Sequence, residues 1–310
     1  MSARDKSKRE SLFVRGSEAA ERGLGVAPGT YVCPLCARPF QRNSLDSGEL
    51  TLEHVPPRSV GGRGIVLVCR DCNSRAGHTI DAAIAGRETA FAFQASVAGM
   101  DTDAVSVTRV SIGGETLNAT FERDEGWGGI KVLPDRNDPA ALARLNDLFD
   151  RFERGEGADE MTIGVRVVRG FDGGHALVGD LKAAYLLAFA VLGYRWAADP
   201  SLSPVRAQIA DPDREILGRW WLDPNHVAEH VIALTDTRTD PVIRCLCVRL
   251  PRTVVLLPWF DRGDLYARIA AATSSGAEAL QFGTSLRFPW PASLDMRLDF
   301  LDVQQLQALG

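Results

Sequence analysis

Two cysteine pairs constrain the fold of this chain more than any other feature of its sequence. The segments CPLC (33–36) and CRDC (69–72) both have the spacing C-x-x-C, and 32 residues separate them. Each pair forms a turn that offers two sulfur atoms to one metal ion, and four thiolates suit tetrahedral zinc. The segment between the pairs is too small to bury a sufficient core, so a bound metal contributes directly to its folding. We therefore predict a structural zinc ion held by Cys33, Cys36, Cys69 and Cys72.

The composition excludes several classes of protein. The 310 residues are 45% hydrophobic and 24% charged, with a net charge of −5. These values are ordinary for a globular protein and exclude collagen-like, disordered and disulfide-scaffold classes. They also exclude a uniformly basic nucleic-acid binder. A slight excess of Lys and Arg is confined to the first 90 residues, so we expect any contact with phosphate in that part.

The chain carries no pattern that predicts secretion or membrane insertion. Residues 1–13 include basic side chains, but no apolar stretch follows them. The longest apolar run, 181–194, is shorter than a bilayer span, and Lys182 and Arg195 mark its ends. We predict a buried core helix there and a cytoplasmic protein, in which thiols favour metal binding over disulfides. Cys245 and Cys247 lie on one side of a predicted strand and are interpreted as small buried residues.

The pattern of apolar residues predicts three parts. Residues 1–28 lack a clear period and are interpreted as an N-terminal arm, and residues 29–87 hold the cysteine pairs. Residues 88–310 alternate strand and helix patterns and are assigned target recognition, oligomerisation or regulation. Strands are predicted at 105–112, 116–122, 161–168, 242–250 and 253–260, and helices at 139–154, 181–196 and 265–272. The fold class is α+β, with a small zinc-stapled domain followed by a larger mixed α+β domain.

Further motifs lie around the cysteine pairs. Between the pairs are EHVPP (53–57) and a Gly-Gly step at 61–62, and the second pair continues as CRDCNSRAGHTID (69–81). In this order the segment resembles the HNH endonuclease family, and within it a subgroup with EHxxP and CxxCNSxxGxxID motifs. The resemblance covers residues 31–84. It implies a ββα-metal nuclease fold, in which a β-hairpin and a helix surround one metal ion.

The resemblance assigns roles to three residues. His54 matches the general base that activates water, Glu53 matches the acidic ligand of the catalytic metal, and Asn73 matches the second protein ligand. Carboxylate and amide oxygens suit Mg²⁺ or Mn²⁺, which would stabilise the leaving 3′-oxygen. The implied activity is metal-dependent hydrolysis of phosphodiester bonds in DNA, leaving a 5′-phosphate. Restriction or anti-phage defence is the setting that the resemblance suggests.

The segment departs from the family pattern at one position. Gly64 stands where the family has its middle Asn, so we expect a backbone carbonyl or another side chain to orient His54. His78 and Asp81 follow Asn73 on the predicted helix, and Asp81 lies about 80° around it, close enough to support the site. Contacts to substrate phosphate are expected from Arg58, Arg63, Arg70 and Arg75, and from His78.

Three alternatives remain open at this stage. The first is a zinc-ribbon module that binds nucleic acid without cleaving it, the second is an RNA-cleaving toxin that uses the same site, and the third is a structural partner protein. The expected partners are nucleic acid, foremost DNA, and either a second copy of the chain or a defence-system protein, but not a membrane. We expect one tightly held zinc per chain and a weaker, exchangeable divalent ion.

Overall fold

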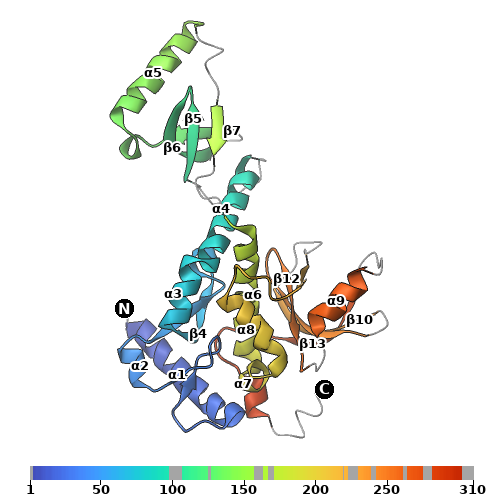
Figure 1. Cartoon of the computed structure of the whole chain (residues 1–310). Helices are drawn as coiled ribbons and strands as arrows, with labels where there is room; N and C mark the ends of the chain where they lie inside the picture. The colour runs from blue at the N-terminus through green and yellow to red at the C-terminus, as the bar shows by residue number, and fades with distance from the viewer. Residues whose placement is uncertain are drawn as a thin grey trace. The chain divides into compact units, whose positions relative to one another are not determined.

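The computed structural model describes most of the chain, in which helices and antiparallel strands are mixed (Figure 1). The described residues are 3–97, 107–124, 127–156, 163–166, 171–218, 220–222, 230–238, 242–260, 264–274 and 281–301. Two compact units are present, one made of residues 1–84 and 173–310 and the other of residues 85–172. The α+β fold class is therefore confirmed, whereas the units do not divide at the predicted boundary after residue 87.

The N-terminal part of the first unit contains the predicted hairpin and helix. Strands β3 (Leu50–Val55) and β4 (Arg63–Cys69) pair antiparallel, and α3 (Arg70–His78) follows β4 directly. The remaining elements are β1 (Tyr31–Val32), which pairs with β2 (Pro39–Phe40), then α2 (Asn43–Asp46), η1 (Arg58–Val60) and α4 (Ile80–Val97). The order ββα agrees with the fold that the resemblance implies.

The prediction of an irregular N-terminal arm is wrong. Residues Ala3–Leu24 form the helix α1, which buries Leu12, Phe13 and the two alanines at 19 and 20. A Cβ atom at Gly16 would lie 2.3 Å from the Tyr31 ring, so this glycine lets the helix approach β1 closely. Small residues occupy many of the buried positions, and for this reason the sequence shows no obvious helical period.

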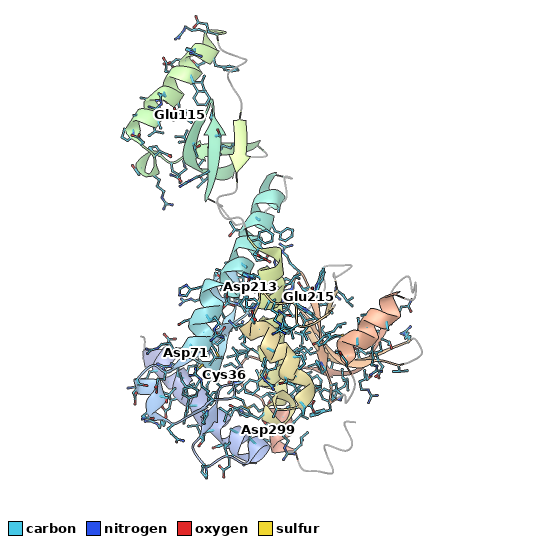
Figure 2. The ribbon with its side chains drawn as sticks, viewed as in Figure 1. Cys36, Asp71, Glu115, Asp213, Glu215 and Asp299 are labelled. Carbon is cyan, nitrogen blue, oxygen red and sulfur yellow. The ribbon has the colours of Figure 1, made fainter. Side chains whose placement is uncertain are left out.

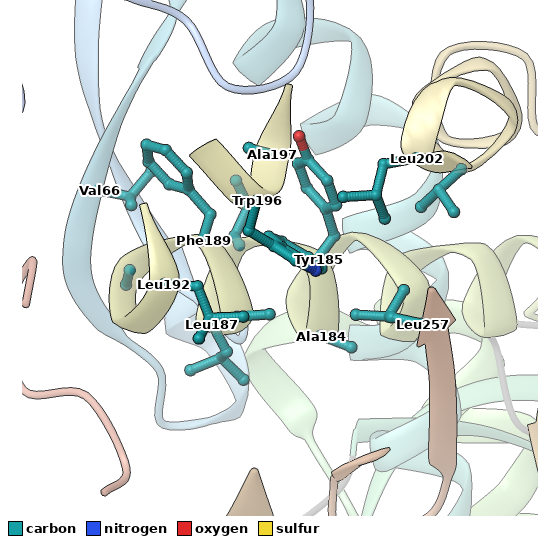
Figure 3. Close-up of a cluster of buried hydrophobic side chains, with 14 of the residues drawn as sticks. Val66, Ala184, Tyr185, Leu187, Phe189, Leu192, Trp196, Ala197, Leu202 and Leu257 are labelled. Carbon is teal, nitrogen blue, oxygen red and sulfur yellow. The ribbon is translucent and has the colours of Figure 1, made fainter. Parts of the chain in front are cut away.

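The centre of the first unit is α6 (Gly173–Leu192), whose residues from 178 to 192 are all buried. The predicted helix at 181–196 is thus longer at its start, and it ends at Gly193, before the short helix α7 (Tyr194–Ala197). Figure 3 shows Tyr185 and Phe189 of α6 packed near Trp196 and Leu257. The helix is long and apolar enough to span a membrane, but 89% of that window is buried inside the protein.

A five-stranded sheet forms the C-terminal part of this unit. Its order is β13-β10-β11-β12-β9, and every neighbouring pair is antiparallel. Strands β11 and β12 confirm the predicted strands at 242–250 and 253–260, and Cys245 and Cys247 lie on β11 as expected. The strands are β9 (Trp221–Leu222), β10 (Val231–Thr237), β11 (Arg244–Arg249), β12 (Val254–Pro258) and β13 (Phe282–Phe288). The helices around it are η4 (Pro200–Leu202), α8 (Ser203–Ala210), α9 (Leu265–Ser274) and η5 (Arg297–Phe300).

One hydrophobic core joins the hairpin to α6 and to this sheet. Buried residues of α1, β4, α6 and β11 all belong to the same cluster. Because α6 is apolar around its whole circumference, it packs on the hairpin with one side and on the sheet with another. This shared core is the physical reason why the cysteine segment is not a compact unit of its own.

The second unit has a separate core. Its sheet has the antiparallel order β7-β6-β5-β8, and α5 packs against β6. The elements are β5 (Val107–Ile112), β6 (Glu115–Asp124), β7 (Trp127–Val132), η2 (Pro134–Arg136), α5 (Pro139–Glu153) and β8 (Ile163–Arg166). Val110, Leu117 and Leu145 form the centre of its hydrophobic cluster. The helix at 139–154 and the strand at 116–122 are confirmed, and the strands at 105–112 and 161–168 are confirmed over residues 107–112 and 163–166, the rest of each lying outside the described residues.

Candidate metal centre and hairpin site

The four predicted zinc ligands converge. Cys33 and Cys36 follow β1, Cys69 ends β4, and Cys72 lies in the first turn of α3. Their sulfur atoms all lie within 4.8 Å of one another, and the Sγ atoms of Cys36 and Cys69 are 3.7 Å apart. A tetrahedral zinc ion with Zn–S bonds of ~2.3 Å requires sulfur–sulfur distances of about 3.8 Å. The donor set therefore fits one structural zinc, and no other metal-ligand cluster of three or more His, Cys, Asp or Glu occurs in the described residues.

Arg38 supports this cluster, although no motif in the sequence singles it out. Its Nη2 atom donates to the Cys69 sulfur at 3.1 Å and to Asp71 Oδ2 at 2.6 Å, and its Nε atom lies 3.5 Å from the Cys36 sulfur. Figure 2 shows Cys36 and Asp71 on the neighbouring segments that this guanidinium joins. A guanidinium beside the sulfur atoms favours their thiolate form, which is the form that binds zinc.

The three predicted catalytic residues lie on adjoining elements, Glu53 and His54 on β3 and Asn73 on α3. Thr51 and Glu53 are two residues apart on β3 and share one of its faces, whereas a register shift between Glu53 and His54 interrupts the regular pairing at His54. The Nδ2 atom of Asn73, on α3, donates to Thr51 Oγ1 at 2.9 Å. Asn73 thus contacts the face of β3 that Thr51 shares with Glu53.

A lysine that the sequence analysis did not assign to the site contacts Glu53. The Nζ atom of Lys182 lies 2.6 Å from Glu53 Oε1 and 2.7 Å from Asp81 Oδ2. The side chains of Lys182, Glu53 and Asp81 are only 3%, 4% and 14% exposed. The interpretation of Lys182 as one end of an apolar run is therefore wrong, because this residue lies well inside α6.

Burial and charge oppose each other in this group. Burial raises the pKa of the Glu53 carboxyl, and the nearby Lys182 ammonium works against that rise. Burial alone would lower the pKa of Lys182, but the two carboxylates raise it above its ordinary value. Lys182 is consequently a charged ammonium, which is the cation that Glu53 and Asp81 share in this structure.

Asp81 reaches the site from a different helix than expected. The helix α3 ends at His78, Thr79 has φ −113° and ψ −89°, and a new helix, α4, begins at Ile80. The predicted angle between Asn73 and Asp81 on a common helix is therefore wrong. The Oδ1 atom of Asp81 is buried and has no hydrogen-bond partner, so this carboxylate retains one oxygen that Lys182 does not engage.

His54 lies opposite Gly64, the residue that stands where the family pattern has its middle Asn. Gly64 of β4 is its register partner, and a β-bulge follows between Glu53 and His54. A Cβ atom at Gly64 would lie 2.6 Å from the Leu52 side chain, so a larger residue there requires Leu52 to move. Burial, followed by the positive charges of Arg58 and Lys8, lowers the pKa of His54. The imidazole is therefore neutral at pH 7, the form that accepts a proton.

The predicted phosphate-contacting residues divide into two groups. Arg70 is committed to the fold, because its Nε donates to the Gly48 carbonyl and its Nη2 to the Ser47 carbonyl, both at 2.9 Å. The side chains of the others are exposed: Arg58 on η1, Arg63 on β4, and Arg75 and His78 on α3.

The oxygen donors match a hard cation in kind. Glu53 and Asp81 supply carboxylates, and the hydrogen bond from Asn73 Nδ2 to Thr51 leaves the Asn73 amide oxygen for another partner. Such donors are those that Mg²⁺ and Mn²⁺ prefer. Glu53 and Asp81 already meet on one positive charge, the Lys182 ammonium.

Comparison with known proteins gives one match. Residues 33–87 match a family model described as HNH endonuclease, and the match spans under a fifth of the chain. No curated protein and no solved structure matches the chain. The matched segment contains the four cysteines, the β3–β4 hairpin, α3 and the start of α4.

Proposed function

We propose that this protein, whose residues 33–87 form an HNH endonuclease domain, is a metal-dependent nuclease that hydrolyses phosphodiester bonds in DNA. The observation that carries the proposal is the coincidence of the family match with the geometry. The four-cysteine cluster stands at the base of the hairpin and helix on which His54, Glu53 and Asn73 are placed. A nuclease-type function follows from the domain, and the roles of His54, Glu53 and Asn73 are part of the proposal.

In this proposal two oxygen-donating side chains hold a divalent ion. Glu53 and Asn73 belong to one side of the hairpin, as ligands of the same ion must. Mg²⁺ or Mn²⁺ bound there supplies charge stabilisation for the departing 3′-oxygen. The Lys182 ammonium occupies the cation position beside Glu53.

His54 acts as the general base. Its pKa is lowered, and its side chain is half-buried at the end of β3, near the exposed Arg58. The guanidinium groups of Arg58 and Arg63 stand next to this end of the hairpin and can bind the phosphate backbone. Their position supports the assignment of this side of the domain to substrate binding.

The structural zinc fixes the catalytic frame rather than the chemistry. Its ligands end β4 and begin α3, so the metal sets the junction between the strand and the helix that bears Asn73. The Arg38 contacts to two cysteines and to Asp71 reinforce the same junction. We place the protein in the cytoplasm and in restriction or anti-phage defence, as the family resemblance suggests.

The direct test is nicking of supercoiled plasmid by the full zinc-loaded chain with Mg²⁺ or Mn²⁺. We expect His54→Ala to lower the rate by roughly 10²–10⁴-fold, because general-base catalysis contributes that much. His230→Ala is the matched control, since this exposed histidine lies just before β10, outside the nuclease segment, and its rate should stay within about twofold of wild type.

Zinc content and melting temperature of each variant must equal those of the wild type. Equal cleavage by His54→Ala and wild type would refute the assigned base. Parallel reactions with single-stranded RNA and tRNA decide the substrate class, because cleavage of RNA alone would make the protein a ribonuclease. If the protein binds DNA tightly but cleaves it with none of the divalent ions, it is a DNA-binding module and not a nuclease.

A further inference from the structure

Lys182 lies outside the nuclease segment, yet its ammonium contacts two carboxylates of that segment. It projects from α6, more than ninety residues after the HNH match ends. Its Nζ atom bridges Glu53 Oε1 on β3 and Asp81 Oδ2 on α4, at 2.6 and 2.7 Å. The rest of the chain therefore inserts one fixed positive charge into the face of the hairpin where the proposed metal ligand lies.

The surroundings of Lys182 hold the ammonium in place. Its side chain is only 3% exposed, and its neighbours in α6, Leu181 and Ala183, are buried in the shared core. A buried ammonium is costly without partners, so removal from Glu53 and Asp81 would leave three uncompensated charges. The group is thus a permanent part of the structure and not a surface ion pair that forms and breaks freely.

A divalent ion at Glu53 meets this ammonium at close range. Lys182 already engages one oxygen of Glu53, so the ion must share the carboxylate with it. Two positive centres on one carboxylate repel each other, and the repulsion is weakly screened because the side chains are buried. The unpartnered Oδ1 atom of Asp81 offers the ion a second buried oxygen but does not remove the repulsion.

We propose that Lys182 sets the affinity of the hairpin site for divalent ions by competing with them for Glu53. The proposal rests on the proposed function in one respect, since it takes Glu53 as the metal ligand. It makes the site a cation site with a resident ammonium, which offsets one of the two carboxylate charges without a metal, so that the site binds Mg²⁺ or Mn²⁺ only weakly. It also makes α6 a part of the site, so the nuclease segment alone lacks the residue that sets its metal requirement.

The first experiment measures Mn²⁺ binding to the full zinc-loaded chain by electron paramagnetic resonance, without substrate. Lys182→Met keeps the length of the side chain and removes its charge, and we expect it to bind Mn²⁺ at least about tenfold more tightly than wild type. Lys182→Arg keeps the charge and should bind Mn²⁺ as weakly as wild type. Lys131→Met, in the second unit, is the control for the loss of a lysine elsewhere.

If Lys182 competes with Mn²⁺ for Glu53, the tighter Mn²⁺ binding of Lys182→Met must depend on Glu53. In the double variant Lys182→Met, Glu53→Gln the tighter Mn²⁺ binding should disappear. Unchanged or weaker binding in Lys182→Met, or a gain that survives the loss of Glu53, would overturn the proposal.

A second experiment on the wild type does not depend on the folding of any variant. The chain has only four lysines, at 6, 8, 131 and 182, so lysine labelled with ¹³C gives four resolvable side-chain methylene signals. Because Mn²⁺ broadens nearby resonances, substoichiometric Mn²⁺ should broaden the Lys182 signal before that of Lys131. A Lys182 signal that persists while Mn²⁺ saturates the protein would place the ion elsewhere and overturn the proposal.

These readouts separate the inference from the proposed function. If Lys182→Met tightens Mn²⁺ binding through Glu53 but no variant cleaves nucleic acid, the competition holds and the nuclease proposal fails. If the wild type cleaves DNA and Lys182→Met binds Mn²⁺ with the same affinity as wild type, the nuclease proposal holds. The proposed competition between Lys182 and the ion then fails.

Discussion

Asp299 shows at the scale of a residue how a single carboxylate organises a helix start. Its two oxygens accept hydrogen bonds from the backbone N–H groups of Tyr194 and Arg195, the first two residues of α7. Gly193 precedes them with φ +91°, and a Cβ atom there would collide with Asp299. Burial raises the pKa of Asp299 from 3.8 to about 6, although these backbone groups oppose the rise.

This raised pKa predicts a pH dependence of stability. The folded chain holds the Asp299 proton more tightly than the unfolded chain, so the contribution of the residue to the free energy of unfolding is largest at low pH. It decreases as the pH rises from about 4 to about 6 and is constant above that window. Between pH 5 and 7.5 the loss amounts to about 1 kcal/mol.

Urea unfolding of wild type and Asp299→Asn at both pH values measures this contribution. The difference between the two proteins isolates Asp299, because zinc release and other titrating groups affect both equally. We expect the stability of the wild type relative to Asp299→Asn to fall as the pH rises. A relative stability that rises with pH would show that the backbone hydrogen bonds outweigh burial at this carboxylate.

The predictability of the site differs from residue to residue. The spacing of the four cysteines identified the zinc cluster because each C-x-x-C turn is local and needs no tertiary information. Lys182 could not be assigned to the site, because its partners Glu53 and Asp81 are more than a hundred residues away in sequence. The sequence did contain one signal for this role, a single lysine within an apolar helix. Such a lysine predicts a buried ammonium, which needs a partner of opposite charge.

At the scale of elements, the zinc cluster and three tyrosines hold the cysteine segment on the core. The phenol groups of Tyr31, Tyr185 and Tyr194 donate to the carbonyls of Leu67, Pro34 and Val32, at 2.7, 2.9 and 2.6 Å. Two of these bonds run from α6 and α7 to the strand and turn that precede Cys36. The four-cysteine cluster and the core therefore meet at the same turn.

Removal of zinc should destabilise the first unit without abolishing its core. We expect chelation, or the variant Cys69→Ser, to lower the melting temperature by about 10 °C, because the cluster contributes several kcal/mol and each kcal/mol shifts a unit of this size by roughly 2–4 °C. Cys247→Ser is the matched control, since this thiol lies on β11 outside the cluster. Bound zinc is counted by elemental analysis.

An unchanged melting temperature after complete loss of zinc would show that the core alone holds the hairpin. A shift in Cys247→Ser as large as that in Cys69→Ser would assign the effect to thiol loss in general. Neither result agrees with four sulfur atoms that converge on one point.

Elements with strong periodicity were predictable, and those that depend on close packing were not. The strands β5, β11 and β12 follow alternating or β-branched runs, and α5 begins with Pro139 after the capping residue Asp138. The helix α1 was missed because its buried side includes small residues such as Gly16 and Ala20. Small residues carry little apolar signal in sequence, although they permit the closest approach of backbone to partner.

At the scale of the whole molecule, the order of parts along the chain differs from the order of compact units. Sequence patterns predict domains made of consecutive residues, whereas the first unit combines residues 1–84 with residues 173–310. The cause is α6, which buries its entire circumference and needs partners from both segments. The second unit, residues 85–172, is thus an insertion that begins within α4 and ends before α6, with its own hydrophobic cluster.

This arrangement predicts that the insertion can be removed. The start of α4 packs directly on α6, because a Cβ atom at Gly179 would lie 2.6 Å from Ile84 and 2.8 Å from the Ile80 carbonyl. Replacement of residues 85–172 by a Gly/Ser linker of about 20 residues removes the second unit, since such a chain costs little loop-closure free energy. We expect the shortened protein to keep one zinc per chain, the melting transition of the first unit and its Mn²⁺ affinity within about twofold.

The isolated segment 29–87 is the contrasting control. It lacks α1 and α6, so the buried faces of Tyr31 and Leu67 become exposed to water and Glu53 loses Lys182. We expect this fragment to bind a hydrophobic dye and to melt without a cooperative transition even with zinc, because the core that it shares with α6 is absent. If segment 29–87 melts cooperatively while the shortened protein is unfolded, the cysteine segment is the independent folding unit and the shared core with α6 is not required.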